Sequence, residues 1–140
     1  MISYLNATHQ NDFAFYIDSF EREDGTTKYY KTTQPYGTQA TLSWNESLGY
    51  TLVIDLIKST DQVKVDEAYM KYYSQYKDCL KGVEKTVEKH VTETINGRDH
   101  LHRAWVQNGR LVKGYMMLSE FKDPNGEFGV QLLIADKPQQ

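Results

Sequence analysis

Residues 66–80 read DEAYMKYYSQYKDCL, and this stretch decides the fold that the sequence predicts. Its aromatic and aliphatic residues recur at spacings of three and four, which is the period of an amphipathic α-helix. With its neighbours on either side, the stripe consists of Val65, Tyr69, Tyr72, Tyr73, Tyr76, Leu80 and Val83. We expect Asp66 to be the N-cap of this helix and the helix to end near Gly82.

An aromatic stripe of this kind needs a surface to lie on. A buried tyrosine removes ~150–250 Å² from water, and a lone helix of this length is only marginally stable. The second half of the chain offers such a surface, because three Asn-Gly pairs, at 96–97, 108–109 and 125–126, are flanked by alternating apolar residues. Asn-Gly provides the positive φ angles that two-residue hairpin turns require. The predicted antiparallel strands are 98–107, 110–122 and 127–135.

Alternation along these strands assigns their residues to two faces. The face predicted to meet the helix carries Leu101, Trp105, Leu111, Tyr115, Met117, Phe121, Phe128, Val130, Leu132 and Ile134. The opposite face carries Val106, Val112, Met116, Leu118 and Leu133. An apolar far face must meet solvent, the N-terminal strands, a second subunit or a ligand, so it is a candidate binding surface.

The first half of the chain predicts further strands at 13–20, 27–33, 40–44 and 50–57. Asp24-Gly25 marks a turn between the first two, and the apolar run at 50–57 suits a central strand. Residues 84–95 are rich in β-branched side chains and are predicted as a strand. The spacing of four between Val83, Val87, Val91 and Ile95 also fits a continued helix.

These elements predict an α+β fold in which an antiparallel sheet packs on one main helix. We expect one domain over residues 1–140, with residues 1–12 as a loose N-terminal arm and 136–140 as a polar tail. A cystatin-like or NTF-like cone, with the sheet wrapped around the helix, is the alternative architecture.

The composition argues against several classes of function. The net charge is −3 and the 16 Lys and Arg residues are dispersed through the chain, so no nucleic-acid partner is predicted. No apolar run is long enough for a transmembrane segment. Cys79 is the only cysteine, which leaves no internal disulfide, and we expect it to be a small buried side chain. The compartment stays open between the cytoplasm and an envelope or secreted location after removal of a signal segment.

No catalytic or cofactor motif is present, so the sequence predicts neither a catalytic residue nor a cofactor. His100 and His102 have a metal-ligand spacing, because alternate residues of a strand share a face, and His90 or Glu120 could approach from neighbouring strands. Third and fourth ligands at a recognisable spacing are missing, and we therefore expect solvated histidines. Asp55 is unusual because it lies inside an apolar run. Facing inward, it would need a partner or a raised pKa, and an edge position facing solvent explains it as well.

The order of elements resembles the PsbP-like or DcrB-like group. The resemblance covers about residues 40–135. It is carried by the helix with Glu67-Ala68-Tyr69-Met70-Lys71-Tyr72-Tyr73, the exit Leu80-Lys81-Gly82-Val83 and the turn Ile95-Asn96-Gly97. It implies non-enzymatic roles such as envelope lipoprotein, photosystem assembly factor or adaptor chaperone, and it brings no catalytic residues with it.

Two functions are compatible with these observations. The first is a non-enzymatic binding or adaptor module that holds a protein segment or an apolar ligand on a sheet face or groove, with a possible homodimer. Its predicted binding residues are Trp105, Val112, Tyr115, Met116 and Leu118. The second is a small-molecule or enzymatic pocket inside a curved sheet with the helix as lid, in which Asp55, His100 or His102 faces inward.

Overall fold

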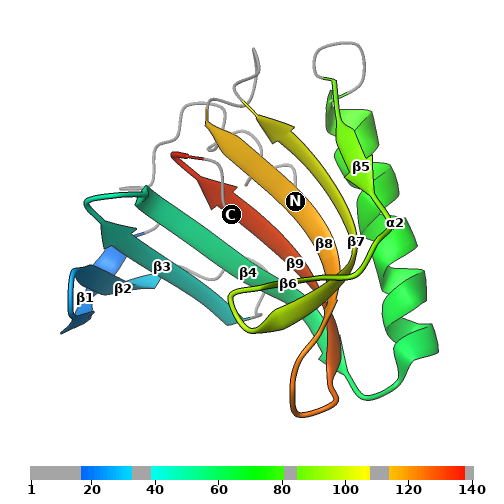
Figure 1. The fold of residues 1–140 in the computed structure, drawn as a ribbon, viewed down its shortest axis with the longest axis horizontal. Coiled ribbons are helices and arrows are strands. Elements are labelled where there is room, and N and C mark those ends of the chain that lie inside the picture. Colours follow the sequence, from blue (N-terminus) through cyan, green and yellow to red (C-terminus); the bar gives the residue numbers. More distant parts are fainter. Residues whose placement is uncertain (1–16, 33–38, 81–84, 108–113, 138–140) are drawn as a thin grey trace.

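One curved antiparallel sheet forms the body of the protein. The computed structural model describes residues 17–32, 39–80, 85–107 and 114–137. Within them the strands are β1 (Ile17–Asp24), β2 (Thr27–Thr32), β3 (Gln39–Asn45), β4 (Gly49–Ser59), β5 (Val87–Lys89), β6 (Glu93–Ile95), β7 (Arg98–Gln107), β8 (Tyr115–Lys122) and β9 (Phe128–Ala135). The strand order is β1-β2-β3-β4-β9-β8-β7-β5, and β6 also pairs with β7 (Figure 1).

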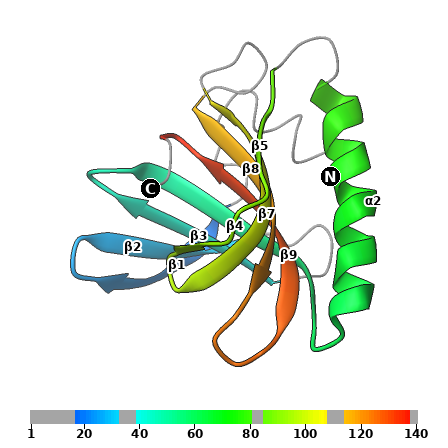
Figure 2. The same cartoon turned by 45° about the vertical axis from the view of Figure 1, so that its right-hand side comes forward.

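A single long helix, α2 (Gln62–Leu80), follows β4 and lies against one face of the sheet. Figure 2 shows α2 on one side of the sheet, while the hairpins β1–β2 and β3–β4 spread away from it. This arrangement confirms the predicted α+β fold. No helix in the described ranges is long and apolar enough to cross a membrane.

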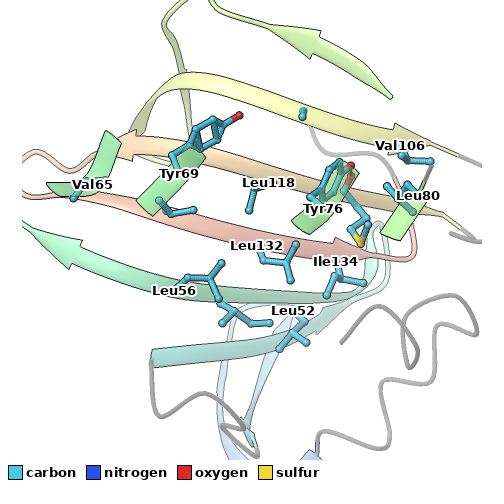
Figure 3. Packing of buried hydrophobic residues seen from close by; sticks show 14 of the residues in the cluster. Leu52, Leu56, Val65, Tyr69, Tyr76, Leu80, Val106, Leu118, Leu132 and Ile134 are labelled. Atoms are coloured by element: carbon cyan, nitrogen blue, oxygen red, sulfur yellow. Dashed lines mark hydrogen bonds between the residues drawn. The ribbon is translucent and has the colours of Figure 1, made fainter. Parts of the chain in front are cut away.

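The tyrosine stripe of α2 packs into the main core, as its spacing predicts. Val65, Tyr69, Tyr76 and Leu80 are buried against the strands (Figure 3). Their partners from the sheet include Leu42, Leu52, Ile54, Leu56, Ala104, Val106, Met116, Leu118, Val130, Leu132 and Ile134. The Tyr76 hydroxyl donates a hydrogen bond of 3.3 Å to the Met116 carbonyl oxygen, which satisfies a polar group that would otherwise be buried without a partner.

The helix begins five residues earlier than predicted. The side chain of Asp61 accepts hydrogen bonds from the backbone N–H groups of Val63 (3.1 Å) and Lys64 (3.4 Å), so Asp61 is the N-cap. Asp66, which was predicted for this position, lies inside the first turns of α2. The prediction was wrong because the polar residues Gln62 and Lys64 interrupt the apolar spacing without interrupting the helix.

The predicted strand at 84–95 is divided into β5 and β6. Both pair with β7, and residues 90–92 between them belong to neither strand. The turn at Asn96-Gly97 is the predicted two-residue hairpin, because Ile95 pairs with Arg98 and both turn residues have positive φ angles of 54° and 80°. The pair Asn108-Gly109 lies outside the described residues.

The faces of β8 are reversed relative to the prediction. Met116 and Leu118, predicted for the far face, are buried under α2. Tyr115 and Met117, predicted to meet the helix, lie in a second apolar cluster on the opposite face with Leu133 and Ala135. The two faces of β7 are also reversed relative to the prediction, because Val106 pairs with Met116 and Trp105 pairs with Met117. The assignments of Val130, Leu132, Leu133 and Ile134 on β9 are confirmed.

Loop length explains this reversal. Lys122 pairs with Phe128, and the Asp123 N–H donates to the Glu127 carbonyl oxygen at 2.8 Å. The loop is therefore the three residues Pro124–Gly126, with Gly126 at a φ angle of 89°, and not the two residues Asn125-Gly126. One extra loop residue shifts the partner of every β8 residue by one, which exchanges the two faces of the strand.

The predicted ends of the chain are described only in part. Residues 1–12 and 138–140 lie outside the described residues. Asp136 is held to β4, because its N–H donates to the Tyr50 carbonyl oxygen at 3.0 Å and its side chain accepts from the Tyr50 N–H at 2.8 Å.

Candidate functional site

A pocket of about 240 Å³ opens on the sheet face opposite α2. Its polar lining consists of Thr41, Asp55, Asn96, Arg98, His100 and Gln131. Its apolar lining consists of Val53, Ile95, Tyr115, Met117 and Leu133. The lining thus combines a few polar groups with apolar side chains, which is the usual pattern of small-molecule sites.

Strand pairing brings these residues together from distant parts of the chain. Asp55 on β4 is directly opposite Gln131 on β9, and Val53 is opposite Leu133. Leu133 is in turn opposite Met117 on β8. Residues opposite each other in a sheet share a face, so one row across three strands carries the pocket floor.

Arg98 is the centre of the polar wall. Its guanidinium group donates to both carboxylate oxygens of Asp55, at 2.8 and 2.9 Å, and to the Gln131 side-chain oxygen at 2.9 Å. Nε binds Asp123 at 2.9 Å. Burial alone would lower the pKa of Arg98, but the hydrogen bonds and charges of Asp55 and Asp123 outweigh it and raise that pKa. Arg98 is therefore a fixed cation whose charge is already matched.

The guanidinium plane of Arg98 also rests on an aromatic ring. Its Cζ lies 3.9 Å from the centroid of Phe121, which is completely buried. Phe121 in turn packs on Gly129, where any side chain would collide with the ring and with the Ile57 carbonyl oxygen. A glycine on β9 thus makes room for the ring that supports Arg98.

His100 forms the next part of the polar wall and is only 2% exposed. Burial, and then the positive charges of Arg103 and Arg98, lower the pKa of His100 to about 4. Its Nδ1 lies within hydrogen-bond distance of the Ser119 hydroxyl. At neutral pH the imidazole is uncharged, so it has one N–H donor and one acceptor nitrogen.

Most of the remaining groups on this face also have partners, although the buried Nε of Arg103 has none among the described residues. The Tyr115 hydroxyl donates to the Met117 sulfur at 3.5 Å, and burial raises the pKa of Tyr115 to about 12. The Arg103 guanidinium lies 4.9 Å from the Trp105 ring centroid and forms an ion pair with Glu93. Among the lining residues, the only charged pair is Asp55 with Arg98. The pocket therefore presents hydrogen-bonding groups without an unmatched charge.

The predicted binding residues are divided between the two faces. Tyr115 lines the pocket, and Trp105 lies on the same face. Met116 and Leu118 are completely buried beneath α2, so the prediction that they line the far face was wrong. Val112 lies outside the described residues.

His100 and His102 do not share a face, contrary to the prediction. The pairing of β7 with β8 shifts register between them, so Leu101 is an extra residue that forms a bulge. His100 lines the pocket, whereas His102 stacks on Tyr69 of α2 with ring centroids 5.9 Å apart.

Sequence reasoning missed Arg98 and Gln131. Asp55 was the available signal, since an inward carboxylate needs a partner, and Arg98 satisfies that need from 43 positions away. Nothing local in the sequence identifies which of the 16 basic residues does so.

Comparisons of the chain with family models, curated proteins and solved structures find no match. The resemblance to the PsbP-like or DcrB-like group therefore stays a prediction.

Proposed function

We propose that the protein binds a small uncharged molecule in this pocket, with an apolar body and at least one hydrogen-bonding group. The observation that carries the proposal is the group of Asp55, Arg98, Gln131 and His100 beside Val53, Met117 and Leu133 in one pocket. A charged ligand would have to compete with Asp55 for Arg98 or lie beside a buried ion pair without a counterion. An uncharged ligand avoids both costs.

The volume limits the size of the ligand. The pocket volume is about 240 Å³. A cavity of ~150 Å³ is known to hold benzene. A molecule with one ring and a short polar substituent, such as a phenol, an aromatic amide or a lactam, has the matching size and chemistry.

Ligand-observed NMR with a library of uncharged one-ring phenols, amides and lactams tests the proposal. We expect hits whose binding is lost in Val53→Trp, because the indole would fill the pocket from the middle of β4. Val63→Trp is the matched control, since Val63 is 66% exposed on α2 and far from the pocket face. Hits that bind Val53→Trp as well as the parent protein, or a library without a single hit, would contradict the proposal.

Binding of a protein segment on a sheet face stays a prediction. Its residues Met116 and Leu118 are unavailable beneath α2, so only Tyr115 and Trp105 support it among the described residues.

A further inference from the structure

The helix side of the sheet carries a second group of polar residues that the pocket does not use. His102 on β7 and His90, between β5 and β6, point their rings at each other, with Nδ1 atoms 3.3 Å apart. His90 is exposed and His102 half-buried, so solvent reaches the pair. The two rings meet edge to face, with centroids 5.4 Å apart.

The spacing of these nitrogens matches that of two ligands on one metal ion. Imidazole nitrogen binds Zn²⁺ at about 2.0–2.1 Å, and tetrahedral geometry then places two nitrogens about 3.3–3.4 Å apart. The stacking of His102 on Tyr69 holds one ring in place before any ion arrives. A preformed ligand ring loses little conformational freedom on binding.

A buried carboxyl group also lies on this face. Glu120 is directly opposite His102 across β7 and β8 and is 1% exposed. It does not form a three-ligand group with the two histidines. The site therefore depends on the two imidazole nitrogens, which are ordinary ligands of Zn²⁺.

We propose that His90 and His102 bind a divalent transition-metal ion of the Zn²⁺ class through their Nδ1 atoms. No group of three His, Cys, Asp or Glu side chains within the described ranges is placed to hold a metal by itself. The two imidazoles therefore supply two ligands and water completes the coordination, so the site is open to exchange. It lies on the sheet face opposite the pocket and is independent of the proposed small-molecule function.

Calorimetric titration of the untagged, EDTA-treated protein with ZnCl₂ at pH 7.5 tests this site. We expect one Zn²⁺ per chain. The affinity for Zn²⁺ should fall at least about 10-fold in His90→Gln and in His102→Gln. Loss of a residue that only supports a metal ligand already costs about 10-fold, and these two residues are the ligands themselves. Glu46→Gln is the control, because it removes an exposed ligand-type side chain between β3 and β4 and should leave the affinity unchanged.

Electron paramagnetic resonance of the Cu²⁺-loaded protein provides a second readout. We expect hyperfine coupling to two imidazole nitrogens in the parent and to one in each single variant. Thermal unfolding in EDTA checks that the variants fold. The site is refuted if folded His90→Gln and His102→Gln both bind Zn²⁺ as the parent does. It is equally refuted if the parent binds none, in which case the 3.3 Å contact is an imidazole–imidazole hydrogen bond.

Discussion

The two faces of the sheet are built from alternating residues of the same strands, but they have different compositions. Under α2, β8 and β9 present Met116, Leu118, Leu132 and Ile134, all completely buried. On the opposite face the same strands present Met117, Ser119, Gln131 and Leu133. Of the six buried polar or charged residues in the described ranges, Glu120 alone faces the helix. Asp55, His100, Arg103, Ser119 and Gln131 belong to the other face.

The helix face therefore contributes mainly to stability, and the pocket face holds the candidate binding site. The helix face excludes water over a continuous apolar area, which is the main source of folding free energy. The pocket face keeps polar groups in fixed positions through mutual hydrogen bonds and leaves a space beside them. Each of the following predictions compares the two faces or tests one of them.

The largest expected effect compares two neighbouring leucines of β9. We expect Leu132→Ala to lower the free energy of unfolding by about 3–5 kcal/mol, because it leaves a closed cavity beneath α2. Leu133→Ala should cost only about 2 kcal/mol, since it enlarges a pocket that already exists. Urea unfolding measures both. Equal losses would mean that the pocket face is packed as tightly as the helix face.

The polar wall should depend on Arg98. We expect Arg98→Met to cost about 3 kcal/mol, because it leaves the carboxylate of Asp55, 7% exposed, without its partner. The double variant Asp55→Leu with Arg98→Met should recover part of this loss. Arg22→Met is the matched control, as Arg22 is exposed and lies over the Tyr29 ring. If Arg98→Met unfolds at the same urea concentration as Arg22→Met, the ion pair contributes little.

His100 should make stability depend on pH. Its folded pKa of about 4 lies below the ordinary value of 6.5, so between these values the unfolded chain binds a proton that the folded chain does not. Stability is therefore lost as the pH falls from 6.5 towards 4, by on the order of 2–3 kcal/mol at pH 4.5. His100→Gln should remove this part of the pH dependence. Urea unfolding of both proteins at pH 7 and 4.5, in EDTA, measures it, and parallel pH curves would contradict the expectation.

The smallest effect concerns the start of the helix that covers the apolar face. Asp61→Ala should lower the free energy of unfolding by about 1 kcal/mol, because two N–H groups of the first turn lose their acceptor. Asp61→Ser, which keeps a capping oxygen, should cost only a small part of that. Thermal unfolding distinguishes the two, and an equal loss in both would show that the capping oxygen is not the source of the stability.

The sequence predicted the features that depend on short-range patterns. The tyrosine spacing predicted α2 and its buried side, and Asn96-Gly97 predicted a two-residue turn, because both depend on residues within a few positions of each other. The faces of β7 and β8 depend on the length of the Pro124–Gly126 loop, and Asn125-Gly126 suggested the wrong length. The pocket depends on bulges and on the pairing of Asp55 with Arg98, which sequence periodicity does not reveal.

The loop at Pro124–Gly126 has a consequence for how chains related to this one can vary. Removing or adding one residue there would turn the apolar underside of β8 towards the pocket and the pocket lining towards α2, unless a new bulge compensated. A change of two residues would leave every side chain on its present side. In descendants of this chain, insertions and deletions at this hairpin should therefore be tolerated in even numbers and selected against in odd ones, although the loop itself lies at the protein surface.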